Sequence, residues 1–136
     1  MAIVTSQGKD WLTDKGQSVE ARPAGGNGGA TGPGLMDRIW WGTGTSAEAT
    51  TNTFATSTER VAEARVTGVL SQPTSTTDRC VGTITSTGTA NITESGRTNT
   101  TIVGQVGESM LMRALMTAVP VLAADAITFT LDVLTA

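Results

Sequence analysis

The chain lacks several residue types on which enzyme chemistry and disulfide-bonded scaffolds depend. It contains no His and no Tyr, only 2 Phe, and one Cys, which is Cys80. Without His the commonest general base near neutral pH is missing, and a single Cys excludes an intrachain disulfide framework and a Cys-rich zinc site. We therefore expect no catalytic, cofactor-binding or metal-binding residues, and we expect Cys80 to be a small buried core residue.

Charge and long apolar runs are also scarce. Charged residues make up 15% of the 136 residues, and the formal net charge is -3. An acidic balance without clustered Lys and Arg argues against nucleic acid as a partner. No apolar run approaches about 18 residues, so we expect no membrane partner, and the first residues lack the pattern of a signal peptide. We therefore expect the chain to stay in the compartment in which it is made.

Threonine and glycine fill the gap, and they favour short strands. About a fifth of the residues are Thr, and there are 16 Gly. Thr is β-branched and suits a strand, while its hydroxyl can face water. Several short strand-like segments, separated by Gly or Pro, predict an all-β fold: an antiparallel β-sandwich, jelly-roll-like, or a partly open barrel.

The clearest strand lies near the C-terminus. Apolar and polar residues alternate from Ala126 to Leu134, which predicts one buried and one solvated face. A sheet that is rich in Thr and poor in charge is badly protected against edge-to-edge pairing. We therefore expect identical copies of the chain to cover its edges. The residues expected to face the core are Ile127, Phe129, Leu131 and Val133.

The sequence divides into an N-terminal arm, residues 1–34, and a β-sandwich domain, residues 35–136. Thr5 or Ser6 could cap a short helix whose apolar patch is Trp11 and Leu12. A helix this short is marginal alone and must dock against a sheet or a neighbouring subunit. Residues 21–34 are Gly-rich, which is typical of a linker or an extended arm.

Two adjacent tryptophans give the strongest signal for binding. Neighbouring residues of a strand point to opposite faces, so one of Trp40 and Trp41 can enter the core while the other needs cover elsewhere. That cover comes either from the chain itself or from a partner subunit, where Trp is a frequent anchor. The candidate partner-interface residues are Trp11, Leu12, Trp40 and Trp41.

The sequence also predicts the local structure of three further segments. Residues 43–58 are nearly all Thr, Ser, Ala and Asn, which predicts a surface excursion anchored by Phe54. A strand is expected from about residue 62 onward, because β-branched residues precede the turn after Leu70. Glu94 precedes Ser95 and Gly96, so we interpret it as a turn or interface charge.

Seven short stretches follow one another along the chain after the Gly-rich arm. They are Trp41-Gly-Thr-Gly-Thr-Ser-Ala, Thr53-Phe54, Glu63-Ala-Arg-Val-Thr-Gly, Val81-Gly-Thr-Ile-Thr-Ser-Thr-Gly-Thr, Asn91-Ile-Thr-Glu, Met110-Leu-Met-Arg-Ala and Asp125-Ala-Ile-Thr-Phe-Thr-Leu. In this order they resemble a family of small tailed-bacteriophage virion proteins, from about Trp40 to the C-terminus. Members of this family are β-rich structural components of virions.

The resemblance implies one of two virion roles. The first is a capsid decoration (cement) protein, a homotrimer that binds the major capsid protein on the capsid exterior after assembly in the bacterial host cytoplasm. The second is a tail fibre, collar or baseplate module used in host attachment. A third hypothesis, of another class, is a small carbohydrate-processing enzyme or lectin, in which Trp40 or Trp41 stacks on a sugar and carboxylates such as Glu48 and Glu94 act on it.

Overall fold

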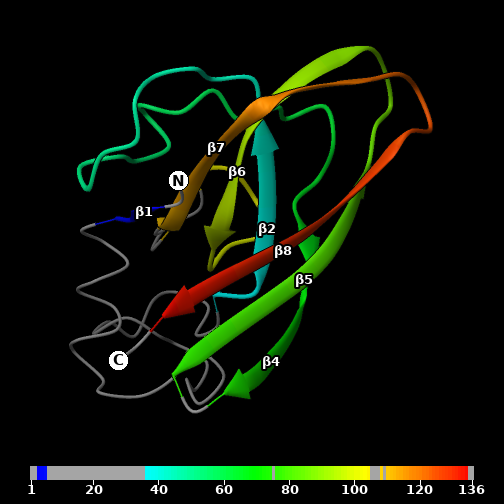
Figure 1. Cartoon of the computed structure of the whole chain (residues 1–136). Coiled ribbons are helices and arrows are strands. Elements are labelled where there is room, and N and C mark those ends of the chain that lie inside the picture. The colour runs from blue at the N-terminus through cyan, green and yellow to red at the C-terminus, as the bar shows by residue number, and fades with distance from the viewer. Residues whose placement is uncertain (1–2, 6–35, 75, 105–107, 109, 135–136) are drawn as a thin grey trace.

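The structure is a computed structural model that describes residues 3–5, 36–74, 76–104, 108 and 110–134. This described part is all-β and contains no helix, so it also contains no apolar helix of membrane-spanning length. Its strands form two antiparallel sheets (Figure 1). The strands are β1 (Ile3–Val4), β2 (Arg38–Gly42), β3 (Val66–Thr67), β4 (Val69–Thr74), β5 (Thr77–Thr85), β6 (Ala90–Thr98), β7 (Met110–Val121) and β8 (Ala126–Leu134).

The larger sheet has five strands in the order β1-β7-β6-β2-β3. Its centre is the pair β6 and β7, whose register shifts between Ile92 and Glu94, so that β7 bulges there. Ile3 and Val4, which belong to the expected arm, pair with β7, and the Thr5 N–H donates to the Leu111 carbonyl over 3.1 Å. The first residues of the expected arm are therefore part of this sheet.

The smaller sheet has three strands in the order β4-β5-β8. β5 and β8 pair from Thr77 with Leu134 to Thr85 with Ala126, with no register shift. Along β8 the inward-facing Phe129 and Leu131 are buried, while the outward-facing Thr130 is exposed. The expected alternation of this strand is confirmed.

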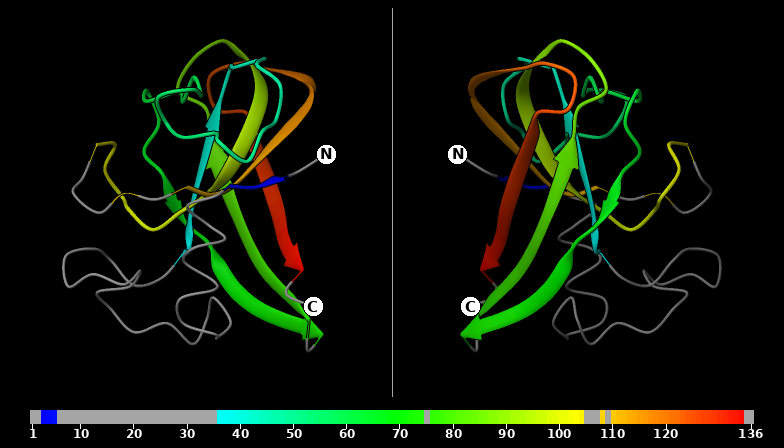
Figure 2. Two further views of the ribbon diagram at one scale, coloured as in Figure 1. Left: turned by 90° about the vertical axis from the view of Figure 1, so that its left-hand side faces the viewer. Right: turned by 90° about the vertical axis from the view of Figure 1, so that its right-hand side faces the viewer.

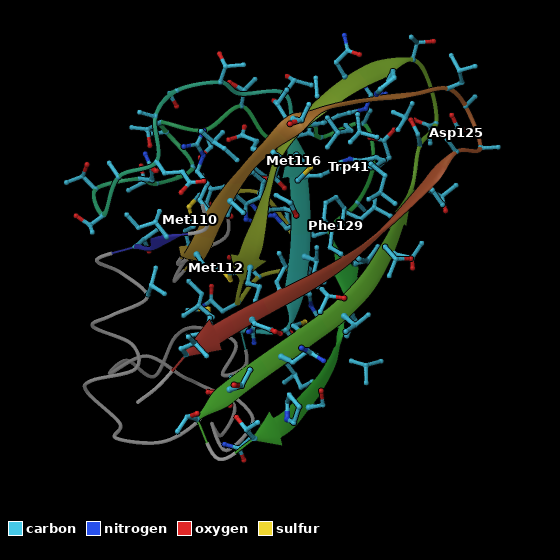
Figure 3. The ribbon with its side chains drawn as sticks, in the orientation of Figure 1. Trp41, Met110, Met112, Met116, Asp125 and Phe129 are labelled. Carbon is cyan, nitrogen blue, oxygen red and sulfur yellow. The ribbon has the colours of Figure 1, made fainter. Side chains whose placement is uncertain are left out.

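The hydrophobic core lies between the two sheets. Trp41 of β2 meets Phe129 of β8 edge-on, with ring centroids 6.3 Å apart (Figure 3). Cys80 on β5 is fully buried, as expected, and Met112 of β7 packs in the same cluster. The described strands make two packed antiparallel sheets and do not close into a barrel. The buried members of the core are Met36, Ile39, Trp41, Cys80, Ile84, Ile92, Leu111, Met112, Val121, Phe129, Leu131 and Val133.

The segment before β4 and the N-terminal segment differ in how they compare with the sequence-based expectations. The strand expected from about residue 62 begins only at Val66, because Glu63 and Arg65 turn their side chains into polar contacts within the fold. The expected N-terminal helix, with Trp11 and Leu12, lies outside the described residues.

Candidate functional site

The two tryptophans lie on opposite faces of β2, and each side chain is only 1% exposed. Trp41 points into the core, where its Nε1–H donates to the Glu63 carboxylate over 3.2 Å. Trp40 points to the outer face of the five-stranded sheet. There it packs edge-on against Phe54, with ring centroids 5.4 Å apart. This contact anchors residues 43–58 to the sheet through Phe54, as expected from the sequence.

The cover over Trp40 therefore comes from the chain itself. Gly96 lies directly opposite Trp40 on β6, and a Cβ at that position would overlap the indole ring. Of the four candidate interface residues, Trp40 and Trp41 are therefore not brought together, and each is too buried to offer surface to a partner. Trp11 and Leu12 lie outside the described residues.

A fully buried ion pair lies beside Trp40 on the same outer face. The Arg113 Nε atom of β7 is 2.6 Å from the Glu94 Oε2 atom of β6, and both side chains have no exposed area. The interpretation of Glu94 as a turn or interface charge is wrong. β6 continues through Ser95 and Gly96 to Thr98, and the carboxylate faces its cationic partner on the neighbouring strand.

The ion pair holds residues 43–58, which we call the cover loop, against the sheet. Glu94 Oε1 accepts the main-chain N–H groups of Gly44 and Thr58 over 3.0 and 2.7 Å. Arg113 donates to the Ser46 carbonyl over 3.0 Å and to Asn52 Oδ1 over 3.2 Å. Each buried charge is therefore both paired and hydrogen-bonded, which is what makes its burial tolerable.

Close approach to Glu94 also explains a motif. A Cβ at Gly42 or at Gly44 would overlap the Glu94 carboxylate. Only glycine lets the main chain close over the buried charge at these two positions. The anchoring of the cover loop therefore accounts for the two glycines of the Gly-Thr-Gly sequence, and no phosphate-binding or nucleotide-binding role is needed to explain them.

Glu63 is a second buried acceptor and connects three segments of the chain. Its carboxylate accepts from Trp41 Nε1, from Arg60 Nε over 2.7 Å, and from the N–H and hydroxyl of Thr87 over 2.8 and 2.7 Å. Burial raises the pKa of Glu63, but the hydrogen bonds from Thr87, Arg60 and Trp41 outweigh it and lower the pKa to about 2. Glu63 therefore stays ionised at every pH at which proteins normally work.

Arg65 organises the other end of the cover loop. It forms a bidentate pair with Glu59, with both N–O distances 2.7 Å, and its Nη1 atom lies 2.7 Å from Glu108. The same nitrogen donates to the Thr100 hydroxyl over 2.6 Å. Its guanidinium lies over the Phe54 ring, 4.3 Å from the centroid, as a cation–π contact.

Arg97 joins the two sheets across the core. This residue of β6 is fully buried, and it donates to the main-chain carbonyls of Met36 over 3.1 Å, Asp78 over 3.3 Å and Leu131 over 3.4 Å. A guanidinium can satisfy several carbonyls at once because its donors are fixed in one plane. The sequence pattern did not predict the burial of Arg65, Arg97 and Arg113.

The carboxylates considered for glycoside chemistry are used structurally. Glu94 is fully buried with Arg113, and Glu48 accepts the Leu115 N–H over 2.7 Å. Neither Trp40 nor Trp41 exposes a ring on which a sugar could stack. Within the part of the chain that the structure describes, no group of three or more His, Cys, Asp or Glu could hold a metal ion.

Among the described residues, the outer face of the three-stranded sheet makes no buried ion pair and anchors no loop. Thr83 and Thr128 share a 2.7 Å hydrogen bond across the sheet, and Arg79 forms a bidentate pair with Asp132 at 2.8 Å. The face is otherwise neutral, and Val69 on β4 is 72% exposed. We take this face, together with the free side of β8, as the candidate interaction surface.

No protein-family model, no curated protein and no solved structure matches the chain.

Proposed function

We propose that the chain is a structural protein of a tailed-bacteriophage virion, a capsid decoration protein that binds the outer surface of the shell together with copies of itself. The observation that carries this proposal is the contrast in how the chain uses its polar groups. Its buried charges hold the fold together, while the three-stranded sheet presents a neutral, Thr-rich face and an edge strand to other molecules. Such a surface suits broad contact with neighbouring subunits.

The sequence resemblance supports the same role through the fold. The stretches that carry it contain Gly42, Gly44, Glu63, Arg65 and Arg113, and these residues build the buried polar framework. The stretches that carry the resemblance therefore include residues that hold this fold together. An acidic chain also suits the capsid exterior better than contact with packaged DNA.

A tail fibre, collar or baseplate module is the second candidate, and one observation favours it. Ile102 and Val103 are 66% and 48% exposed, on a loop whose base is held by Arg65 through the Thr100 hydroxyl. Exposed apolar residues on a firmly anchored loop suit contact with a host receptor.

Gold-labelled antibody against the chain, applied to virions of the phage that encodes it, separates the two candidates. We expect label over the whole head, with a copy number that follows the capsid lattice. Label confined to the tail, at a much lower copy number, would support the second candidate and reject decoration. Virions without label would reject both.

A further inference from the structure

Most sheet edges in the described residues carry protection against pairing with another chain. β4 contains Pro73, and its register with β5 shifts between Ser71 and Thr74. The long β7 contains Pro120, and Glu48 occupies its Leu115 N–H. Proline, register irregularities and charged side chains at an edge are the devices by which natural sheets avoid unwanted strand addition.

The two end strands of the five-stranded sheet are short. β1 lies beside β7 and β3 beside β2, and each has 2 residues. Beyond β3, the β2 edge is occupied by the end of the cover loop and the residues after it, because the Thr43 N–H donates to the Thr58 carbonyl and the Arg60 N–H to the Trp41 carbonyl. None of these edges offers a long run of main-chain groups.

β8 has none of these devices. It has 9 residues without Pro, Gly, Lys or Arg, and its pairing with β5 runs without a register shift. Its only charge, Asp132, is occupied by Arg79. β8 is the outermost strand of its sheet (Figure 2), and no described strand pairs with its other side.

The direction of the main-chain groups follows from the start of the strand. The Ser86 N–H donates to the Asp125 carbonyl over 2.7 Å, while Thr85 lies opposite Ala126. In an antiparallel ladder this makes Thr85 and Ala126 a non-hydrogen-bonded pair, and such pairs alternate with hydrogen-bonded ones. The N–H and C=O groups of Thr128, Thr130 and Asp132 therefore point away from β5, toward the free side.

We propose that β8 pairs antiparallel with β8 of a second copy of the chain, around a two-fold axis at Thr130. A head-to-tail ring needs two different edges that accept each other, and the described residues offer one long unprotected edge. One edge can bind only its own equivalent, which makes the contact isologous. Pairing of the whole strand would form about ten main-chain hydrogen bonds, the number found in an ordinary protein interface.

Side chains and charges agree with this register. An axis at Thr130 places Phe129 opposite Leu131 of the second copy, so the two cores meet along one apolar row. It also places Thr128 opposite Asp132, so that no two like charges face each other. The two three-stranded sheets then become one continuous sheet, with the Thr-rich faces on the same side.

This inference rests on the self-association in the proposed function and specifies its geometry. It replaces the trimer implied by the resemblance with a two-fold dimer. A dimer that spans two positions would attach to a capsid lattice through two contacts at once, which strengthens binding by raising the effective concentration of the second contact.

Sedimentation velocity of the full chain tests the pairing with two variants at one position. Thr130→Pro removes an N–H from the free side and leaves the β5 ladder its donors, so we expect the Kd of the dimer to rise at least about tenfold. Thr130→Val keeps the N–H and the β-branched shape and is expected to dimerise like the wild type. A wild type that sediments as a monomer or a trimer would overturn the inference, as would an unchanged Kd in Thr130→Pro.

Residue-resolved amide hydrogen exchange tests the β8–β8 pairing in the wild type. It therefore does not depend on whether the Thr130→Pro variant folds. We expect Thr128, Thr130 and Asp132 to exchange slowly in concentrated solution and quickly after dilution below the Kd. Phe129 and Leu131 are bonded to β5 and should stay slow in both. Equal, fast exchange of the three free-side amides at all concentrations would contradict the pairing. Virion labelling is independent of both measurements, since it reports where the chain binds and not how copies pair.

Discussion

The two sheets of this protein use an arginine–carboxylate pair in opposite surroundings. Arg113 and Glu94 lie on the outer face of the five-stranded sheet under the cover loop, with no exposed area. Arg79 and Asp132 lie on the outer face of the three-stranded sheet, where their side chains are 38% and 35% exposed. The bond lengths are similar, so the difference between the pairs is one of solvent access.

Solvent access decides what each pair contributes. Breaking a buried pair leaves a charge that has neither water nor a partner. When an exposed pair is broken, water solvates the remaining charge, so little stability is lost. The five-stranded sheet thus uses the outer face around Glu94 and Arg113 to fix a loop. No described segment covers the outer face of the three-stranded sheet, which is why we place the interaction surface there.

The largest effect is expected from Arg113→Met. The variant leaves the Glu94 carboxylate buried with only the Gly44 and Thr58 N–H groups as partners. Removing one member of a buried ion pair costs about 3–5 kcal/mol, so the free energy of unfolding should fall by that amount in urea titration.

The double variant Glu94→Gln with Arg113→Met serves as the control. Gln keeps an oxygen for the two loop N–H groups but carries no charge that needs a cation, so part of the lost stability should return. If the double variant were less stable than Arg113→Met alone, the stranded charge would not be the cause of the loss.

Glu63→Gln should change how stability depends on pH. The folded-state pKa of Glu63 is lowered from 4.5 to about 2, so its carboxylate stabilises the fold fully above about pH 5 and loses this contribution as the pH falls toward 2. The shift corresponds to roughly 3 kcal/mol. We expect Glu63→Gln to be clearly less stable than the wild type at pH 7 and nearly equal to it at pH 2. A constant difference across that range, measured by urea titration at each pH, would exclude this role.

Gly44→Ala tests whether the cover loop must approach the buried Glu94 carboxylate closely with its main chain. Its Cβ would overlap the Glu94 carboxylate, so the cover loop must lift from the buried pair, and we expect a loss of about 1–3 kcal/mol. Gly88→Ala is the matched control, because its Cβ meets only the Arg60 side chain at 3.5 Å. Thermal unfolding of both variants tests this, and equal midpoints would show that the loop does not need the close approach.

The strands that could be predicted from the sequence are those whose pattern is local. Along β8 every second residue is apolar, and one face is buried, so the period of two appears directly in the sequence. The opposite orientation of Trp40 and Trp41 follows from the same rule. The sequence could not show that the cover for Trp40 comes from Phe54, since that contact depends on how the cover loop returns to the sheet.

The buried charges could not be predicted because their partners are remote. Glu94 is followed by Ser95 and Gly96, a turn-like context, and its cation lies 19 positions away on the next strand. Arg97 donates hydrogen bonds to carbonyls of three separate segments. One signal was present: Arg113 lies between Met112 and Ala114 in an apolar run, where a charge is either exposed or paired.

The smallest effect is expected from Arg79→Ala. Water can replace its bonds to Asp132, so the unfolding curve in urea should coincide with that of the wild type. The substitution should still change the titration of Asp132, because the hydrogen bond from Arg79 lowers the pKa of that carboxyl. In the variant, we expect an NMR titration to show that this pKa rises toward 3.8. A large loss of stability without Arg79 would mean that the outer face of the three-stranded sheet is itself part of the framework, and the contrast between the two sheets would disappear.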